Sequence, residues 1–198
     1  MENFDTFRIR PRVIEDESLV GYLVRLAEVN FCESTSWIAD VVGCKSREVG
    51  YSADAVTALA GVTGQDAGAL LDKAYFRTES QVVVRGTSLP IESVSVAQPR
   101  VCPCCLEESA HRRWWWEVTL VGACPRHGVD LVDHCPRCSK PLSWSMPSVA
   151  RCGCGESLAR IATSPADEKM VRAADLVLTI LSGGVPNRCP EEIGRAHV

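Results

Sequence analysis

Eight of the eleven cysteines in the chain lie between positions 102 and 154, and most of them come in short pairs. Two thiolates separated by two residues can face one ion, because the chain bends into a knuckle between them. Cysteine and histidine at such spacings are typical zinc ligands. The spacing therefore predicts zinc binding rather than disulfides or redox thiols. The pairs are Cys102/Cys105, Cys124/His127, Cys135/Cys138 and Cys152/Cys154.

The simplest arrangement joins neighbouring pairs into two zinc sites. The first two pairs are separated by 18 residues and the last two by 13, and either gap is long enough for a hairpin. An interleaved arrangement, in which alternate pairs share an ion, is the open alternative. In both arrangements four protein ligands close each site and leave no position for water. The two zinc ions would therefore be structural rather than catalytic.

Catalytic uses of these residues find little support. A zinc deaminase needs a His-x-Glu segment before its Cys-x-x-Cys pair, and none of the four histidines has glutamate two positions later. A cysteine nucleophile needs a spare thiol and a base. Cys104 and His111 are close in sequence, but we interpret Cys104 as a bystander within the first knuckle. The sequence thus indicates a protein that is not an enzyme.

Two arginines and three consecutive tryptophans lie between the first two ligand pairs. We predict a strand here, in which two of the tryptophans enter the core, because three consecutive strand side chains cannot all point inward. At least one tryptophan would then be exposed beside the arginines, as at many interfaces. Arginine next to an aromatic ring also suits contact with nucleic acid. The candidate contact residues are Arg112, Arg113 and Trp115.

The elements that must position these motifs begin with a helical N-terminal segment. The segment 15–30 reads as a helix that Asp16 or Ser18 can cap. Arg25 falls opposite the apolar face, where we expect a solvated position. The apolar face consists of Leu19, Tyr22, Leu23, Leu26 and Val29, extended by Asn30.

Short helical pieces follow at 35–42, 53–61 and 65–75. Short helices joined by glycine turns suggest a helix-turn-helix class. Two windows fit that pattern, one at Ala39, Gly43 and Val49 and one at Ala60, Gly64 and Leu70. Lys45 and Arg47 are the better candidates for contact with nucleic acid. A bundle that uses this geometry only for packing, or to dock a protein, is equally compatible with the pattern.

The predicted domains are a helical helix-turn-helix-like unit with a linker at 1–98, a tandem zinc-binding module at 99–160, and a helix with a tail at 161–198. The linker, 79–98, contains short strand-like pieces, and the last helix spans 166–182 before Gly183 and Gly184. The predicted fold class is a mainly α, helix-turn-helix-like N-terminal unit, followed by a small α+β zinc-ribbon or zinc-knuckle module with two zinc sites.

Composition narrows the functional classes. The chain has 198 residues, a formal net charge of −4 and 46% hydrophobic residues. A broadly basic nucleic-acid-binding protein is therefore excluded, although a local basic patch is compatible. The sequence has no apolar run of the length that a membrane span needs, and its N-terminus lacks the apolar core of a signal peptide. We expect a cytoplasmic protein with reduced thiols.

Four segments, in this order, resemble the TniQ family of transposition proteins, to which TnsD-type target selectors are related. They are ESLVGYLVRLAEVN at 17–30, PRVCPCCLEE at 99–108, the tryptophans at 114–116, and CPRHGVDLVDHCPRCSKPL at 124–142. The resemblance spans residues 10–158. It implies that the eight ligands match the family's zinc pattern. It also implies a special structural or functional role for Arg25, because an N-terminal signature is matched by Ser18, Leu19, Arg25 and Leu26.

The resemblance implies a non-enzymatic adaptor that selects the site of transposon insertion. Such an adaptor links DNA, or a CRISPR effector with its guide RNA, to an AAA+ transposition ATPase of the TnsC or TniB kind. A homodimer is compatible with this role. The alternative function is that of a stand-alone zinc-ribbon or helix-turn-helix transcription regulator that binds DNA. Genes for an ATPase and a transposase beside this one would favour the adaptor.

The last seven residues, EIGRAHV, match the translation of a common sequencing-library adapter. We expect these residues not to be native, and the helix at 166–182 to open a further helical domain.

Overall fold

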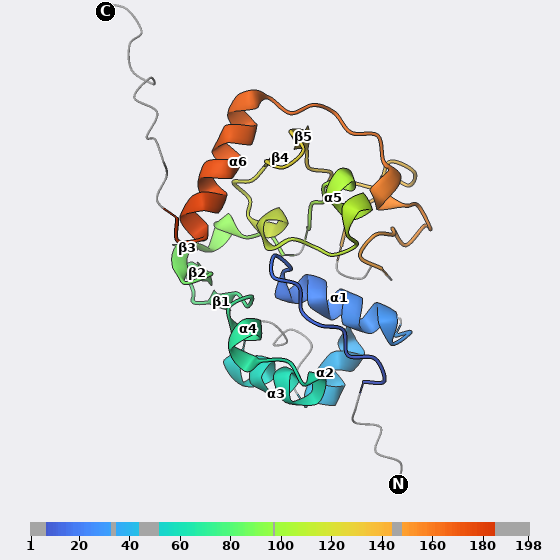
Figure 1. The fold of residues 1–198 in the computed structure, drawn as a ribbon, viewed down its shortest axis with the longest axis vertical. Helices are drawn as coiled ribbons and strands as arrows, with labels where there is room; N and C mark the ends of the chain where they lie inside the picture. The colour runs from blue at the N-terminus through green and yellow to red at the C-terminus, as the bar shows by residue number, and fades with distance from the viewer. Residues whose placement is uncertain (1–6, 33–34, 44–51, 97, 144–147, 185–198) are drawn as a thin grey trace, which may run out of the picture.

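The computed structural model describes residues 7–32, 35–43, 52–96, 98–143 and 148–184. Figure 1 shows the helical N-terminal elements at one end of the molecule and the cysteine-rich module at the other, with α1 between them. The helices among these residues are α1 (Leu19–Val29), α2 (Ser36–Val42), α3 (Ala53–Thr63), α4 (Ala67–Leu71), α5 (Pro103–Glu108) and α6 (Glu168–Leu181). None of them is long and apolar enough to cross a membrane.

Helix α1 is packed on two opposite faces. The predicted apolar face, with Leu19, Tyr22 and Leu23, packs into a core shared with α2, α3 and α4. Val20 and Val24, on another face, pack into a second core with the tryptophans and the cysteine module. Ser18 caps the helix, because its hydroxyl accepts a hydrogen bond from the Gly21 amide. The helix is therefore the central element that joins the two ends of the molecule.

Helices α2, α3 and α4 form the outer layer of the N-terminal end (Figure 1). Gly43 and Gly64 end α2 and α3 in the left-handed conformation, with φ of 71° and 68°. In the second predicted window, Ala60 and Leu70 are buried in one core on either side of Gly64. Helix α4 is only five residues long. The structure thus has short helices around a glycine turn, as the sequence predicts, without confirming a helix-turn-helix arrangement.

A small antiparallel sheet occupies part of the segment that the sequence indicates as a linker. Strands β1 (Phe76–Arg77), β2 (Gln81–Val84) and β3 (Thr87–Pro90) pair in that order, with Val82 opposite Leu89. Val82 and Val84 are fully buried. The pieces 82–84 and 93–96 do enter the core, but 93–96 forms no strand. The segment therefore contributes to the core shared with the cysteine module, which a linker would not do.

The cysteine module contains little regular structure besides α5. It includes the short pair β4 (Ala123–Cys124) and β5 (Val129–Asp130) and the 3₁₀ turns η2 (Trp114–Glu117) and η3 (Leu158–Arg160); a further 3₁₀ turn, η1 (Ile91–Ser93), precedes it. Helix α6 covers β4, as Figure 1 shows, and buries Ala174 and Leu181. On its outer side Leu176 and Ile180 are exposed. Metal binding is the expected source of order in so small and irregular a module.

Candidate metal centres and the buried joint beside them

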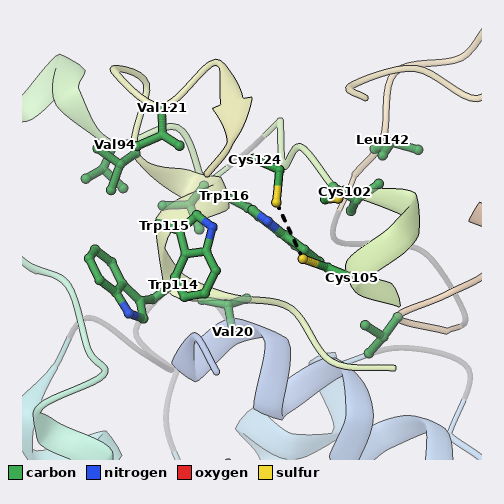
Figure 2. Packing of buried hydrophobic residues seen from close by; sticks show 14 of the residues in the cluster. Val20, Val94, Cys102, Cys105, Trp114, Trp115, Trp116, Val121, Cys124 and Leu142 are labelled. Atoms are coloured by element: carbon green, nitrogen blue, oxygen red, sulfur yellow. Dashed lines mark hydrogen bonds between the residues drawn. The ribbon is translucent and has the colours of Figure 1, made fainter. Parts of the chain in front are cut away.

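The first four ligands converge on one point. Cys105 Sγ lies 3.6 Å from Cys124 Sγ and 3.3 Å from His127 Nδ1, and Cys102 Sγ lies 3.6 Å from the same nitrogen. All four ligand atoms lie within 4.8 Å of one another. The pair Cys102/Cys105 stands at the start of α5, where Pro103 in the first turn fixes the backbone. Figure 2 shows Cys105 and Cys124 facing each other across this point.

His127 is oriented by a partner on its other ring nitrogen. Its Nε2 lies 2.9 Å from Glu108 Oε1 at the end of α5. A carboxylate there holds the proton on Nε2 and leaves Nδ1 free to bind a metal. The crowded thiols also interact strongly, since hydrogen bonds with Cys102 and then Cys105 lower the pKa of Cys124. Hydrogen bonds with Cys102 and then Cys124 raise the pKa of Cys105. A cation would let all these sulfurs be thiolates at once.

The second four ligands also converge. Cys135 Sγ lies 3.6 Å from Cys154 Sγ, and Cys138 Sγ lies 3.8 Å from Cys152 Sγ. The four sulfurs lie within 4.8 Å of one another. The structure therefore groups the ligands sequentially, and the interleaved arrangement is wrong.

Three of the ligand pairs are closed by a residue in the left-handed conformation. Gly128, Ser139 and Gly155 directly follow the second ligand of their pair, with φ of 63°, 55° and 89°. Each donates its backbone N–H to the carbonyl of the first ligand, over 2.8 to 2.9 Å. Glycine adopts this conformation at little cost, whereas Ser139 adopts it despite its Cβ. The chain thus turns sharply enough to aim both ligands of each pair inward.

The two clusters fit tetrahedral zinc. A zinc–sulfur distance of about 2.3 Å places neighbouring sulfurs of a tetrahedron about 3.8 Å apart, close to the 3.6 and 3.8 Å observed in the second cluster. Each cluster supplies four protein ligands, so a bound zinc ion would have no site for a substrate or a water. A bound zinc ion would thus cross-link the four positions of the chain that supply its ligands and would not take part in a reaction.

The three consecutive tryptophans are all buried. Trp114, Trp115 and Trp116 have exposed fractions of 5%, 4% and 1% and lie in the 3₁₀ turn η2. The prediction of a strand with one exposed tryptophan is therefore wrong. A 3₁₀ turn directs successive side chains about 120° apart, so all three rings can reach the core that surrounds the turn. Figure 2 shows Trp115 above Val20 of α1, and Trp116 extending toward Cys105 and Cys124.

The two arginines before the tryptophans are buried as well, each with only 1% exposed. The prediction that Arg112, Arg113 and Trp115 form an exposed contact surface is therefore wrong. Arg113 instead lies over the Trp116 ring, with its guanidinium carbon 5.2 Å from the ring centroid. The backbone of the segment pairs with the residues before α1, since Glu17 and Arg113 form an antiparallel bridge. These arginines are buried by residues almost 100 positions earlier in the chain, and the local sequence does not show that such partners exist.

A polar joint connects α1 to this segment. We use the name joint for Glu17, Ser18, Gly21, Arg112, Arg113 and Glu117, all of them buried. The Ser18 hydroxyl donates to Glu117 Oε1 over 2.8 Å, and the Ser18 amide donates to the Arg112 carbonyl over 2.8 Å. A Cβ on Gly21 would lie 2.7 Å from Arg112 Cβ. Only glycine therefore lets α1 approach the segment so closely.

Arg25 belongs to the same region and is not a solvated residue. Its guanidinium forms two hydrogen bonds with the Glu17 carboxylate, of 2.7 and 2.6 Å, and a third, of 2.8 Å, with the Arg12 carbonyl. The Glu17 side chain is fully buried. Although burial acts to lower the pKa of Arg25, its hydrogen bonds with Glu17 raise it above the ordinary value. Arg25 thus compensates a buried carboxylate.

Asp16, just before the joint, connects α1 to the first metal cluster. Its carboxylate lies 2.6 Å from His111 Nε2 and within 3.6 Å of both Arg113 and Arg126. Burial acts to raise the pKa of Asp16, but the hydrogen bond with His111 and the electrostatic effects of His111, Arg113 and Arg126 lower it below the ordinary value. Ser109 Oγ lies 3.0 Å from the other nitrogen of His111. These contacts fix the segment before α1 against the residues between the first two ligand pairs.

Burial also perturbs the charged groups of the joint. It raises the pKa of Glu117 to about 7, against the opposing effects of the Tyr75 and Ser18 hydroxyls and the Arg112 charge. It lowers the pKa of Arg112 to about 10, against the effect of Glu117. A buried acid and base of this kind are costly when separated. The attraction between the two groups therefore offsets part of the cost of burying each of them.

The remaining predicted contact residues, Lys45 and Arg47, lie outside the described residues, as do the last seven. Sequence reasoning missed Glu17, Gly21, Glu108 and Glu117. Glu17 and Gly21 stand inside the quoted segment ESLVGY, and that is the signal that could have found them. A buried carboxylate such as Glu117 leaves no signal in a single sequence.

The model of the TniQ family matches residues 8–131, more than half of the chain. The chain belongs to the TniQ family. The matched region contains the joint and all four ligands of the first cluster, whereas the second cluster lies beyond it. No curated protein was found to match the chain. Membership implies a transposition-associated adaptor role.

Proposed function

We propose that this TniQ protein is an adaptor for target-site selection in transposition. It would link a target, either DNA or a CRISPR effector with its guide RNA, to an AAA+ transposition ATPase. The observation that carries the proposal is the family match over residues 8–131, which contains the whole joint. Within that region the chemistry-bearing residues are used for structure: four form a closed ligand set, and the charged residues of the joint are buried.

The fold suits a platform with two ends. Helix α1 lies between the helical layer and the cysteine module, so contacts made at one end are held in fixed orientation to the other. We propose that α2 to α4, including the helix-turn-helix-like pair α3 and α4, contact one partner. The cysteine module would contact the other. A homodimer is compatible with this assignment, and the adaptor would act in the cytoplasm.

An insertion assay tests the proposal. The chain would be supplied to cells or extracts that hold the ATPase, the transposase and the DNA of the same element, and insertion sites would be sequenced. We expect insertion at the selected target to require the chain, and Cys105→Ser to abolish it. An unchanged number and distribution of insertions without the chain would contradict the adaptor function. Regulation of a nearby promoter instead would favour the zinc-ribbon transcription regulator.

A further inference from the structure

Residues 7–14 cross the surface of the helical end as an arm that carries arginine at every second position. The side chains of Arg8, Arg10 and Arg12 are exposed, and no acidic residue lies between Phe7 and Ile14. The chain as a whole has a formal charge of −4. The arm is thus a local concentration of positive charge on an acidic protein.

The arm is fixed in place along its length. Phe7 is buried and packs edge-on against Trp37, with ring centroids 5.0 Å apart. The Asn30 side chain accepts from the Ile9 amide over 3.0 Å and donates to the Ile9 carbonyl over 2.8 Å. Because the backbone is already ordered, a partner would bind the arginines without having to order the arm. Two further hydrogen bonds hold it, from Arg25 to the Arg12 carbonyl and from the Val13 amide to Gln65.

Phe31 stands next to the arm, where it closes the C-terminal turn of α1 in a left-handed conformation. It directly follows Asn30, which holds the arm, and its side chain is 91% exposed. Its φ of 58° lies in the left-handed region, where glycine or asparagine usually ends a helix. A phenylalanine here is unfavourable both for its backbone and for its exposure to water. Such a residue is expected to serve contact with another molecule.

We propose that the arm and Phe31 form a nucleic-acid contact surface. The arginines would bind backbone phosphates, and Phe31 would stack on an unpaired base. Arginine matches phosphate with paired hydrogen bonds, and exposed aromatic rings stack on bases of any type. This inference rests on the proposed adaptor function, because it assigns the surface by which the adaptor would contact its target.

Nucleic acid fits this surface better than an acidic protein does. Among the described residues of this face, Ile9 and Phe31 are the large apolar side chains that are exposed. Two such residues are too few for the apolar centre of a protein interface. This face has more exposed arginines than exposed apolar side chains, as is expected of a surface that binds phosphates.

Binding of fluorescent DNA to the full chain, measured across about 50 to 300 mM salt, tests the proposal. The probe is a single strand of about 20 nucleotides, longer than the site that one such surface would cover. In Arg8→Gln/Arg10→Gln/Arg12→Gln the slope of log K against log salt should be less steep by about 2, since each phosphate contact contributes about 0.7. Phe31→Ser should weaken binding by about 5- to 100-fold with an unchanged slope.

The matched control is Arg160→Gln/Lys169→Gln/Arg172→Gln, which removes the same charge from exposed positions far along the chain. The control should retain the wild-type slope.

Equal weakening of DNA binding in both triple variants would contradict binding at the arm and would indicate that the overall charge of the protein decides DNA binding. A lower melting temperature with unchanged DNA binding would show that the arm arginines serve stability. Lost ATPase binding with retained DNA binding would assign the arm to an acidic protein. Absence of DNA binding by the wild type would overturn this inference alone, because the insertion assay judges the adaptor function separately.

Discussion

The two ligand clusters share their chemistry but differ in their surroundings. In the first cluster Cys102, Cys105 and Cys124 are all fully buried, in one core with the tryptophans and with Val20 of α1. In the second cluster Cys154 is exposed and Cys138 is only partly buried. The first cluster is therefore part of the core that joins both ends of the molecule. The second cluster shares that core through Cys135 and Cys152, whereas its other two ligands lie at or near the surface.

The difference comes from what lies between the ligand pairs. The longer gap of the first cluster contains the tryptophans and Arg112 and Arg113, whose partners are on α1 and in the segment before it. The described part of the shorter gap buries chiefly Leu142 and Val149. A metal cross-link stabilises the fold most where it also orders residues that make other buried contacts. Loss of the first cluster should therefore cost far more than loss of the second.

The largest expected effect is that of Cys105→Ser. Structural zinc binds with a free energy on the order of 10 kcal/mol, comparable to the whole stability of a domain, about 5–15 kcal/mol. We expect the variant to lose the first zinc and to expose its tryptophans, which red-shifts their emission. Cys154→Ser should also lose one zinc but keep Trp114, Trp115 and Trp116 buried. Metal content and fluorescence measure both outcomes, and an equal red shift in the two variants would remove the distinction between the clusters.

Arg25→Ala should produce the next largest effect. The change leaves Glu17 as an unpaired, fully buried carboxylate, which costs about 3–5 kcal/mol. The matched control is Arg172→Ala, because Arg172 pairs with Glu168 in the open, with both side chains more than three-quarters exposed. That pair is worth less than about 1 kcal/mol. Urea unfolding compares the stability of the two variants. Similar midpoints would show that the buried Arg25–Glu17 pair contributes no more to stability than the exposed Arg172–Glu168 pair does.

Gly21→Ala should cost about 1–3 kcal/mol, the usual cost of overpacking. The new methyl group would lie 2.7 Å from Arg112 Cβ and would push α1 away from η2. Gly61→Ala, in α3, is the control, since nothing lies within 4 Å of its added Cβ. Alanine should stabilise that exposed helical position by about 0.5–1 kcal/mol. Thermal melts with opposite shifts would confirm close contact at the joint, whereas a stabilised Gly21→Ala would contradict it.

The smallest expected effect is a change in pH dependence. Since the pKa of Glu117 is raised to about 7, the folded chain keeps a proton that the unfolded chain releases near 4.5. The stability from this proton is complete below about pH 4.5 and is lost as pH rises through about 7. Glutamine at position 117 does not titrate. The free energy of unfolding of Glu117→Gln, minus that of the wild type, should therefore rise by about 1 kcal/mol between about pH 6 and 8.

Urea midpoints of wild type and variant at the two pH values measure this difference, and the pH dependence of metal binding cancels because both proteins share it. A difference that does not change with pH would mean that Glu117 does not titrate in this range, and would contradict a pKa of about 7.

The ligand clusters could be predicted from sequence because each pair is local and the residue types are specific. The helix predicted at 15–30, its Ser18 cap and the helix at 166–182 could also be predicted from periodicity and capping, and the structure has them as α1 and α6. The sheet at 76–90 was not, because its strands are only two to four residues long and read as fragments of a linker.

The positions of Arg112, Arg113 and Trp114–Trp116 could not be predicted from local pattern. Charged and aromatic residues in a row suggest a surface, and here they are buried because partners from far along the chain satisfy them. Ser18 reaches Glu117 across 99 positions, and Asp16 reaches His111 across 95. Arg25 was placed on the solvated face for the same reason, since helix periodicity does not show that Glu17 is buried beside it.

Stepwise metal removal, with released zinc and tryptophan emission measured together, tests the central claim most directly. The account predicts two zinc ions per chain. The more exposed second cluster should release its ion first, while Trp114, Trp115 and Trp116 stay buried. The other ion should leave only as the tryptophans become exposed and the fold is lost. Release of all metal with unchanged emission and melting temperature, or fewer than two zinc ions at the start, would contradict the account.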